Sequence, residues 1–157
     1  MRKDESLTLK TEQLMRDLKV KGEIINHPRQ SGRTTKQARL ALGVHDRFIL
    51  KVLLFKSQEE YVAAIVTGDK RVNKERLERV SGLRDLRLAG LEEVESLTGF
   101  SAGGIPPFIF KDLCTVYVDE EVMKRRFVIG SAGSEYSGVR FSPQELLKLG
   151  YSIACIV

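Results

Sequence analysis

The sequence predicts a mixed α+β fold in which helices flank one central, antiparallel-rich mixed sheet. Two apolar runs, 48–55 and 61–67, are joined by the polar link 56–59, a pattern typical of an antiparallel hairpin. Strand-like runs outnumber those expected from a strict alternation of strand and helix. The length of 157 residues and the apolar fraction of 42% suit a single domain over 1–157 with its own core.

Each element expected in the first half of the chain has a local reason. Apolar residues three and four apart predict a first helix, which lies inside an N-terminal extension over 1–22. Thr34 and Gln37 form a capping-box pattern at the start of a second helix, and Gly43 ends it. The elements expected here are a helix over 8–20, a strand over 23–27, a helix over 35–42, and the hairpin strands 48–55 and 61–67.

The second half of the chain follows the same rules. Asn73 and Gly82 bound a helix, and the three glycines and two prolines of 99–107 mark a loop. Ser142 followed by Pro143 is a typical helix start. The elements expected here are helices over 73–81 and 91–99, strands over 86–88, 115–119, 127–131 and 138–141, a helix over 142–149 and a strand over 153–157.

Composition narrows the classes of function. The 26 basic and 21 acidic residues give a net charge of +5, which is compatible with an RNA or phosphate partner but does not require one. Cys114 and Cys155 are expected to be buried free thiols in a reducing compartment. Neither a signal peptide nor a membrane span is expected, so we expect a cytoplasmic protein. With two histidines and no Walker, Cys-x-x-Cys or Gly-x-Ser-x-Gly pattern, we expect no metal centre, cofactor or serine triad.

Lys51 is the most informative residue of the chain. It interrupts an otherwise apolar strand, and alternation places it on the same face as Ile49, Leu53 and Phe55. Lysine is almost never fully buried without a partner. Lys51 therefore either anchors a polar ligand at the floor of a pocket, or extends from an edge strand into water.

The segment Gly68, Asp69, Lys70 and Arg71 could hold an anion. It follows a strand and precedes a capped helix, where backbone N–H groups and cations can face a ligand. The alternative is an ordinary turn in which the aspartate binds nearby backbone N–H groups.

The loop 103–107 is a second candidate wall. Gly103 and Gly104 allow the backbone to approach a ligand closely, and their N–H groups could point at an oxyanion. Ile105 precedes a proline and is held extended, so the loop would be pre-shaped. The alternative is that the loop, which ends at Pro107, is simply rigid.

Weaker signals come from single residues. His27, before a proline, could donate or accept at a pocket edge, although a structural role is the alternative. Ser131 and Gly133 belong to a small-residue turn beside a strand end. Two basic clusters could contact a phosphate backbone, with a solvated surface as the alternative: Arg29, Arg33, Lys36 and Arg39, and the run 124–126.

Together these motifs resemble the YbaK/prolyl-tRNA synthetase-associated family, whose free-standing members hydrolyse mischarged aminoacyl-tRNA. The resemblance covers about 23–157 and rests on the order and spacing of several motifs. They are His27-Pro28, the segment 34–44, Lys51 in its apolar strand, and the segments 68–71, 97–100, 103–107, 116–119 and 142–147.

The resemblance implies roles for particular residues. Lys51 matches the family's essential lysine, near the substrate's polar groups or the terminal adenosine phosphate, and Gly103 with Pro107 matches a Gly-x-x-x-Pro loop around the aminoacyl carbonyl. The catalytic candidates are Lys51, Gly103, Gly104 and Pro107. The candidate substrate-binding residues are His27, Thr34, Gly68, Asp69, Lys70, Arg71, Ile105, Ser131 and Gly133. Two departures leave the amino acid open: His27 stands where some members carry a tyrosine, and Arg140 where some cysteine-specific members carry an aspartate.

The implied activity is that of a trans-acting deacylase. It would hydrolyse the ester of tRNA mischarged with a small amino acid, such as Ala, Cys or Ser, on the tRNA specific for proline. An activated ester can be attacked by water without a triad or metal, and a small pocket supplies a second sieve. The expected partners are the acceptor end of aminoacyl-tRNA and prolyl-tRNA synthetase. The alternative is a non-catalytic tRNA- or synthetase-binding module with the same fold.

Overall fold

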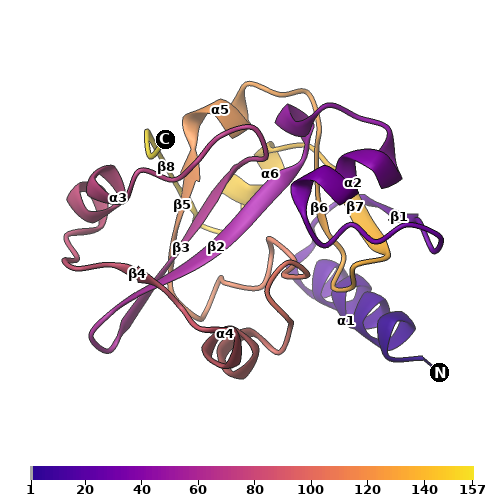
Figure 1. Cartoon of the computed structure of the whole chain (residues 1–157), viewed down its shortest axis with the longest axis horizontal. Helices are drawn as coiled ribbons and strands as arrows, with labels where there is room; N and C mark the ends of the chain where they lie inside the picture. The colour runs from indigo at the N-terminus through magenta and orange to yellow at the C-terminus, as the bar shows by residue number, and fades with distance from the viewer. Residues whose placement is uncertain (1) are drawn as a thin grey trace.

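The computed structural model describes residues 2–157 and shows helices arranged around two sheets (Figure 1). The strands are β1 (Glu23–Asn26), β2 (Leu50–Ser57), β3 (Glu60–Thr67), β4 (Arg87–Leu88), β5 (Thr115–Asp119), β6 (Val128–Ser131), β7 (Ser137–Phe141) and β8 (Ser152–Ala154). The helices are α1 (Lys3–Leu18), α2 (Thr35–Leu42), α3 (Lys74–Ser81), α4 (Leu91–Thr98), α5 (Glu120–Met123) and α6 (Gln144–Leu147), with a 3-10 turn, η1, over Asp46–Phe48.

The larger sheet has five strands in the order β4-β2-β3-β5-β8 and is mixed. β2 and β3 form the expected antiparallel hairpin, with Lys51 opposite Val66. β3 pairs with β5, and β5 with β8, in parallel. β4 pairs with β2 only at Phe55 and Lys56. Within residues 2–157, the first half of β2 therefore has no strand of this sheet on the side away from β3.

The smaller sheet has three antiparallel strands in the order β1-β7-β6. A single parallel bridge connects Ile129 of β6 to Ile49, the residue directly before β2. The expected α+β class with a mixed sheet is confirmed, but the strands divide between two sheets. The division arises because β7 pairs with β1 and β6 on its two sides, while β6 meets the chain before β2 at only one bridge.

The core lies on both faces of the larger sheet, and β3 explains why. Alternate β3 side chains are fully buried on opposite faces, as the period of two along a strand requires. Ala63 and Ile65 join the cluster that contains Phe108 and Phe110. The opposite face holds a second cluster, made of Phe55, Val62, Ala64, Val66, Leu77, Leu86 and Ile156.

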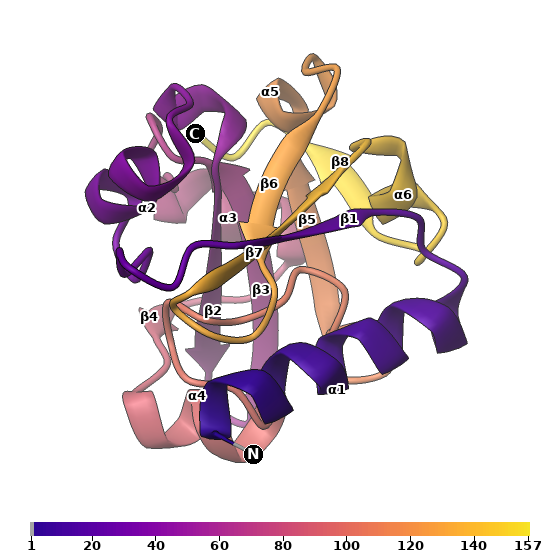
Figure 2. The same ribbon diagram turned by 90° about the vertical axis from the view of Figure 1, so that its right-hand side faces the viewer.

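Helix α1 packs beside the smaller sheet (Figure 2). It begins at Lys3, five residues before the expected start, and ends at Leu18 because Lys19 has a φ of +57°. Its buried residues are Thr11 and Met15. The Oγ1 atom of Thr8 lies 2.9 Å from the Oγ atom of Ser137 on β7. The N-terminal extension is thus tied directly to the β6–β7 hairpin.

Several local expectations differ from the structure. The helix expected over 142–149 is the four-residue α6, and the carboxylate of Glu145 accepts from the Lys21 N–H at 2.7 Å instead of capping its own helix. Helix α5 and the turn η1 were not expected. Cys114 and Cys155 are free as expected, but Cys114 is half-buried and Cys155 is exposed, since it follows an edge strand, β8, whose first two residues are exposed too. Among residues 2–157, no helix combines the length and the apolarity needed to cross a bilayer.

Candidate functional site

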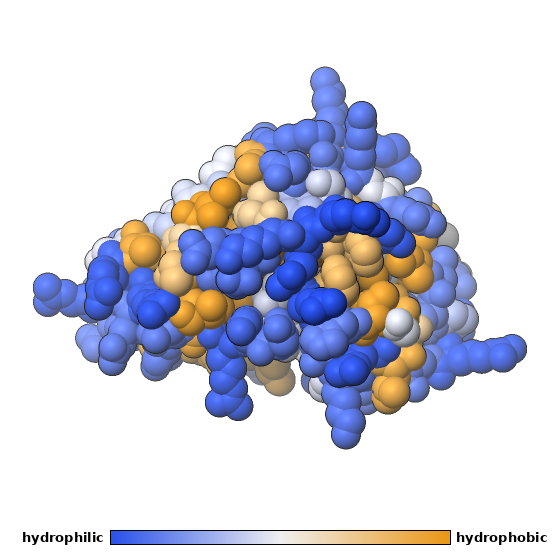
Figure 3. Space-filling model, turned by 90° about the horizontal axis from the view of Figure 1, so that it is seen from above, coloured by the Kyte–Doolittle hydropathy of each residue, from blue (hydrophilic) through white to orange (hydrophobic). Residues whose placement is uncertain are grey.

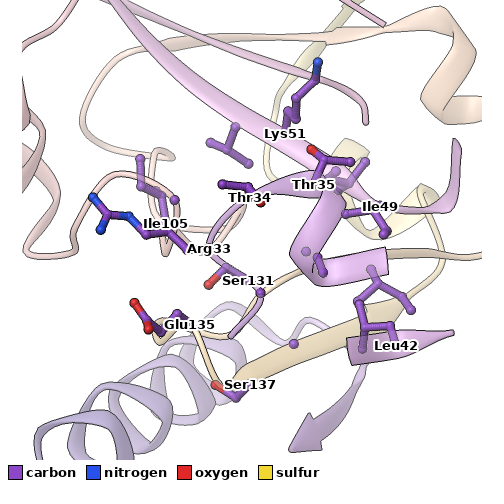
Figure 4. Close-up of a pocket in the computed structure, with 18 of the residues that line it drawn as sticks. Arg33, Thr34, Thr35, Leu42, Ile49, Lys51, Ile105, Ser131, Glu135 and Ser137 are labelled. Carbon is purple, nitrogen blue, oxygen red and sulfur yellow. The ribbon is translucent and has the colours of Figure 1, made fainter. Parts of the chain in front are cut away.

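A cavity of about 250 Å³ lies where the two sheets and α2 meet (Figure 4). Its walls come from the first half of β2, the β6–β7 hairpin, the start of α2 and the loop before Phe108. Ile49 and the first four residues of β2, 50–53, all line it, although alternation would place only every second one on a single face. This is the pattern of a cavity at a strand edge, and it forms because β4 stops short of this half of β2.

Lys51 lines this cavity and is half-buried. Burial, followed by the charge of Arg71, lowers the pKa of Lys51 from its ordinary value, while the carboxylates of Asp69 and Asp46 act in the opposite direction. In Figure 4 the Lys51 amino group points away from Ser131. The ammonium therefore lies at the end of the cavity nearest the segment that follows β3, and the residue is neither fully buried nor fully exposed.

The segment Gly68 to Arg71 does not line the cavity. The Gly68 N–H donates to the carbonyls of Asp46 and Ile49, at 3.1 and 2.7 Å, and the Lys70 N–H donates to the Thr67 carbonyl at 3.0 Å. These two N–H groups are therefore occupied and cannot form the expected anion cradle. The side chains of Asp69, Lys70 and Arg71 are exposed, so their charges remain accessible beside Lys51.

The loop 103–107 is divided between cavity and core. Gly103 and Ile105 line the cavity, and Gly103 has a φ of +85°, which favours glycine. The Gly104 N–H donates to the Ser101 carbonyl at 2.9 Å, so it is not a free oxyanion donor. Within residues 2–157, the Gly103 N–H has no such acceptor.

Pro107 faces the core instead of the cavity. Its carbonyl accepts from the buried Tyr151 hydroxyl at 2.9 Å, and burial raises the pKa of Tyr151. A Cβ atom on Gly130 would lie 2.9 Å from the Pro107 ring, so that ring packs directly behind a cavity-lining residue. Any contribution of Pro107 to a reaction would therefore be made through the loop backbone or through Gly130.

The β6–β7 hairpin supplies a wall of hydroxyl groups. Ser131, Ser134 and Ser137 all line the cavity, and the last two are buried, with their Oγ atoms 3.2 Å apart. The Ser131 hydroxyl accepts from the Gly133 N–H at 3.0 Å. Gly133 itself lies behind the wall, in an adjoining cavity of about 270 Å³ beside α1. These serines are held by hydrogen bonds, so the wall is preorganised.

His27 and Thr34 line the opposite side. His27 Nδ1 lies 2.8 Å from the Gln30 carbonyl, which can only accept, so Nδ1 carries the proton and Nε2 of the neutral ring is an acceptor. Thr34 and Gln37 form the expected capping box, with distances of 3.2 and 3.3 Å between side chain and backbone. The Thr34 hydroxyl is therefore engaged as an acceptor but can still donate to a ligand.

The structure brings together only part of the predicted set. Six of the predicted residues line the main cavity: His27, Thr34, Lys51, Gly103, Ile105 and Ser131. Gly104 and Gly133 line the adjoining cavity, whereas Pro107 and the segment 68–71 line neither. Arg140, named as a departure from the family pattern, is exposed and stacks on the Phe127 ring at 3.9 Å.

Sequence reasoning missed most of the hairpin wall, of which only Ser131 was predicted. Ser134, Glu135, Ser137 and Gly138 also line the cavity but were not among the predicted residues. The available signal was the short polar run between the two expected strands, which had to form a turn close to Ser131. Among residues 2–157, no group of three or more His, Cys, Asp or Glu side chains is placed to hold a metal ion.

Comparison with known proteins agrees with this geometry. The model of a family described as the aminoacyl-tRNA editing domain matches residues 29–149. A proline–tRNA ligase of Caldicellulosiruptor bescii is 32% identical over 105 residues, which are 66% of this chain but only 18% of the ligase. An uncharacterised Bacillus subtilis protein, YwhH, is 29% identical over 78% of each chain.

The fold is also found among solved structures. A crystal structure described as that of a proposed trans-editing enzyme for prolyl tRNA synthetase has a TM-score of 0.85 and 28% identity, with 96% of each chain covered. The likeness includes the region before residue 29, because nearly the whole chain is superposed. The family match spans the half-buried lysine, the hairpin wall and all other cavity-lining residues except His27. This chain therefore belongs to the aminoacyl-tRNA editing domain family.

Proposed function

We propose that this protein is a trans-acting deacylase that hydrolyses the ester of mischarged aminoacyl-tRNA. The observation that carries the proposal is the pairing of a half-buried Lys51 with a small, hydroxyl-lined cavity in a chain of the editing family. The substrate would carry a small amino acid, such as Ala, Cys or Ser, on the tRNA specific for proline. Prolyl-tRNA synthetase is the expected source of such errors and a candidate partner.

The chemistry needs few protein groups, because the substrate is an activated ester. Water attacks the ester carbonyl, the resulting tetrahedral oxyanion collapses, and the bond from the carbonyl carbon to the ribose oxygen breaks, releasing the amino acid and the tRNA. The Gly103 N–H is the candidate oxyanion donor, since no acceptor within residues 2–157 engages it. Losing one such donor costs about 3 kcal/mol in other enzymes. His27 Nε2 is placed as an acceptor on the same cavity and could orient the water.

The size of the cavity supports a small aminoacyl group. The cavity volume of about 250 Å³ must hold the ester and the α-amino group as well as the amino-acid side chain. Ile105, Leu42 and Ile129 add apolar walls that would exclude larger side chains. One methylene group in such a pocket typically changes the rate about 10–200-fold. The pocket would thus act as a second sieve: it would admit the small amino acids that a synthetase site cannot reject, and exclude the larger cognate one.

The tRNA end would be held by cations around Lys51. The exposed Lys70 and Arg71 lie beside it, and both Arg71 and Asp69 influence its charge. The face that contains α2 and α5, at the top of Figure 1, carries projecting hydrophilic side chains around apolar patches (Figure 3). Basic side chains can hold phosphates without reading base sequence.

The test is a deacylation panel of alanyl-, cysteinyl-, seryl- and prolyl-tRNA with three proteins: wild type, Lys51→Ala and the control Lys111→Ala, which alters an exposed lysine away from the cavity. We expect wild type and Lys111→Ala to release the small amino acids, and Lys51→Ala to be inactive while its circular dichroism is unchanged. Full activity of Lys51→Ala would refute the role of Lys51. Fastest release of proline would contradict the sieve. No hydrolysis of any charged tRNA by wild type would favour the non-catalytic module.

A further inference from the structure

The main cavity has charges of opposite sign at its two ends. Lys51 lies at one end and Glu135 at the other, with Ser131 between them in Figure 4. Among the lining residues that the structure describes, Glu135 is the only one with a carboxylate. An isolated acid in a cavity otherwise lined by hydroxyl, apolar and basic groups needs an explanation.

The position of Glu135 is held by the backbone. Glu135 follows β6 in the hairpin turn, and its carbonyl accepts from the Gly32 N–H at 2.6 Å. This bond connects the hairpin to the loop before α2, which forms the opposite wall of the cavity. The side chain is half-buried. Its backbone is thus anchored, and its carboxylate accepts a hydrogen bond from the Tyr136 hydroxyl, which raises the pKa of that tyrosine. A carboxylate has further acceptor positions, which a ligand can use.

The Glu135 carboxylate is not neutralised by a nearby cation. No Lys, Arg or His nitrogen of residues 2–157 lies within 4.0 Å of it. Arg33 lines the same end of the cavity, but it is exposed, and its aliphatic stem packs 3.2 Å from the Cβ position of Gly103. Solvent therefore screens the Arg33 charge, and the carboxylate is available to a ligand cation.

The substrate class proposed above has a matching charge distribution, and the inference rests on that proposed function. An aminoacyl-tRNA end carries phosphates on its nucleotide side and an α-amino group directly beside the ester carbonyl. An ordinary α-amino group has a pKa of about 8 and is mostly cationic at neutral pH. With the phosphate side toward Lys51, the α-ammonium group lies toward the opposite end. We propose that Glu135 binds the α-ammonium group of the aminoacyl ester.

The consequence is selection for a free amino group. An ester with a hydroxyl or an acylated nitrogen in place of the ammonium would leave Glu135 without its ionic partner. Glu135 would then orient the carbonyl toward the Gly103 N–H, because the ammonium and the carbonyl are on adjacent carbons. The pocket would thus select its substrates by the charge of the α-amino group and by the volume of the amino-acid side chain.

The experiment compares two esters that differ only at this atom, alanyl-tRNA and lactyl-tRNA, with wild type, Glu135→Gln and the control Glu59→Gln. Glu59 is exposed at the tip of the β2–β3 hairpin and does not line the cavity. We expect Glu135→Gln to raise the KM for alanyl-tRNA about 10-fold, the lower end for a hydrogen bond between charged groups. The KM for lactyl-tRNA should stay within twofold of wild type. Equal losses on both esters, or none on either, would overturn the proposal.

A binding measurement separates this proposal from the proposed function. The probes are two non-hydrolysable adenosines with an amide at the 3′ position, one carrying alanine and the other lactic acid, titrated by calorimetry. Wild type should bind the alanyl amide more tightly, and Glu135→Gln should remove that preference. If wild type shows this preference but hydrolyses no charged tRNA, the role of Glu135 is supported and only the proposed deacylase function is refuted. Equal affinity of wild type for the two amides would overturn the role of Glu135 whatever the activity.

Discussion

Gly133 supports the hydroxyl wall from behind, and replacing it with alanine should disturb both stability and catalysis. The residue has a φ of +103°, outside the range that alanine adopts readily. A Cβ atom there would lie 2.7 Å from Thr11 Oγ1, 2.8 Å from the Leu7 carbonyl oxygen and 2.8 Å from a Phe100 ring carbon. Two of these neighbours belong to α1, so the helix would have to move.

The expected magnitude has two parts. A left-handed backbone costs a non-glycine residue about 1–2 kcal/mol. Overpacking a buried site adds about 1–3 kcal/mol. We therefore expect Gly133→Ala to lower the free energy of unfolding by about 3 kcal/mol, or the Tm by about 6–12 °C for a chain of this size. Because α1 also contacts Ser137 through Thr8, deacylation should weaken as well.

Gly82→Ala is the matched control. Gly82 has a φ of +76° but no atom within 4 Å of its Cβ position, so alanine there incurs only the backbone penalty. We expect a loss of about 1 kcal/mol, or about 2–4 °C in Tm, with unchanged deacylation. Thermal unfolding followed by circular dichroism gives both values. If both variants lowered the free energy of unfolding by the same amount, this would refute the reasoning that close packing of α1 against the hairpin turn stabilises the protein.

Two further predictions concern the contact between Thr8 and Ser137 and the charge of Lys51. Thr8→Val removes a hydroxyl 2.9 Å from Ser137 and should lower the free energy of unfolding by about 1 kcal/mol, while Thr8→Ser should not; equal urea midpoints for all three proteins would contradict this. Because burial and Arg71 lower the pKa of Lys51, affinity for adenosine 5′-monophosphate should be present at neutral pH and should be lost, as the pH rises, before the pH reaches the ordinary lysine value of 10.5. Lys51→Arg should keep that affinity over the same pH range. A wild-type affinity that did not change between neutral pH and pH 10.5 would contradict the prediction.

Local patterns were reliable where neighbours in sequence decide the structure. The capping box at Thr34 and the antiparallel hairpin around 56–59 are both present. Helix α6 shows the limit of such patterns. Its start contains the expected capping residues, but Glu145 instead accepts from Lys21, 124 positions earlier in the chain. A distant backbone N–H group satisfied the carboxylate, and no short-range rule can anticipate that.

The candidate site shows the same contrast between what local sequence patterns predict and what long-range packing decides. Lys51 was identified because an ammonium within an apolar strand is unusual anywhere in a sequence. The segment 68–71 suggested an anion cradle, yet two of its N–H groups are bound to carbonyls. Pro107 suggested a pocket wall, yet it faces Tyr151 in the core. Whether a backbone group is free depends on what packs against it, which its sequence neighbours do not specify.

By itself, the sequence determined the order of most elements, the hairpin and the family, because those follow from hydrophobic periodicity, capping residues and the spacing of motifs. Only the tertiary structure decided that β4 stops beside Phe55, which leaves a strand edge open to form the cavity. It also placed Glu135 in the same cavity as Lys51, across 84 positions of sequence. The physical reason is that a cavity forms where distant segments fail to fill space, a property of the assembled packing and of no single segment.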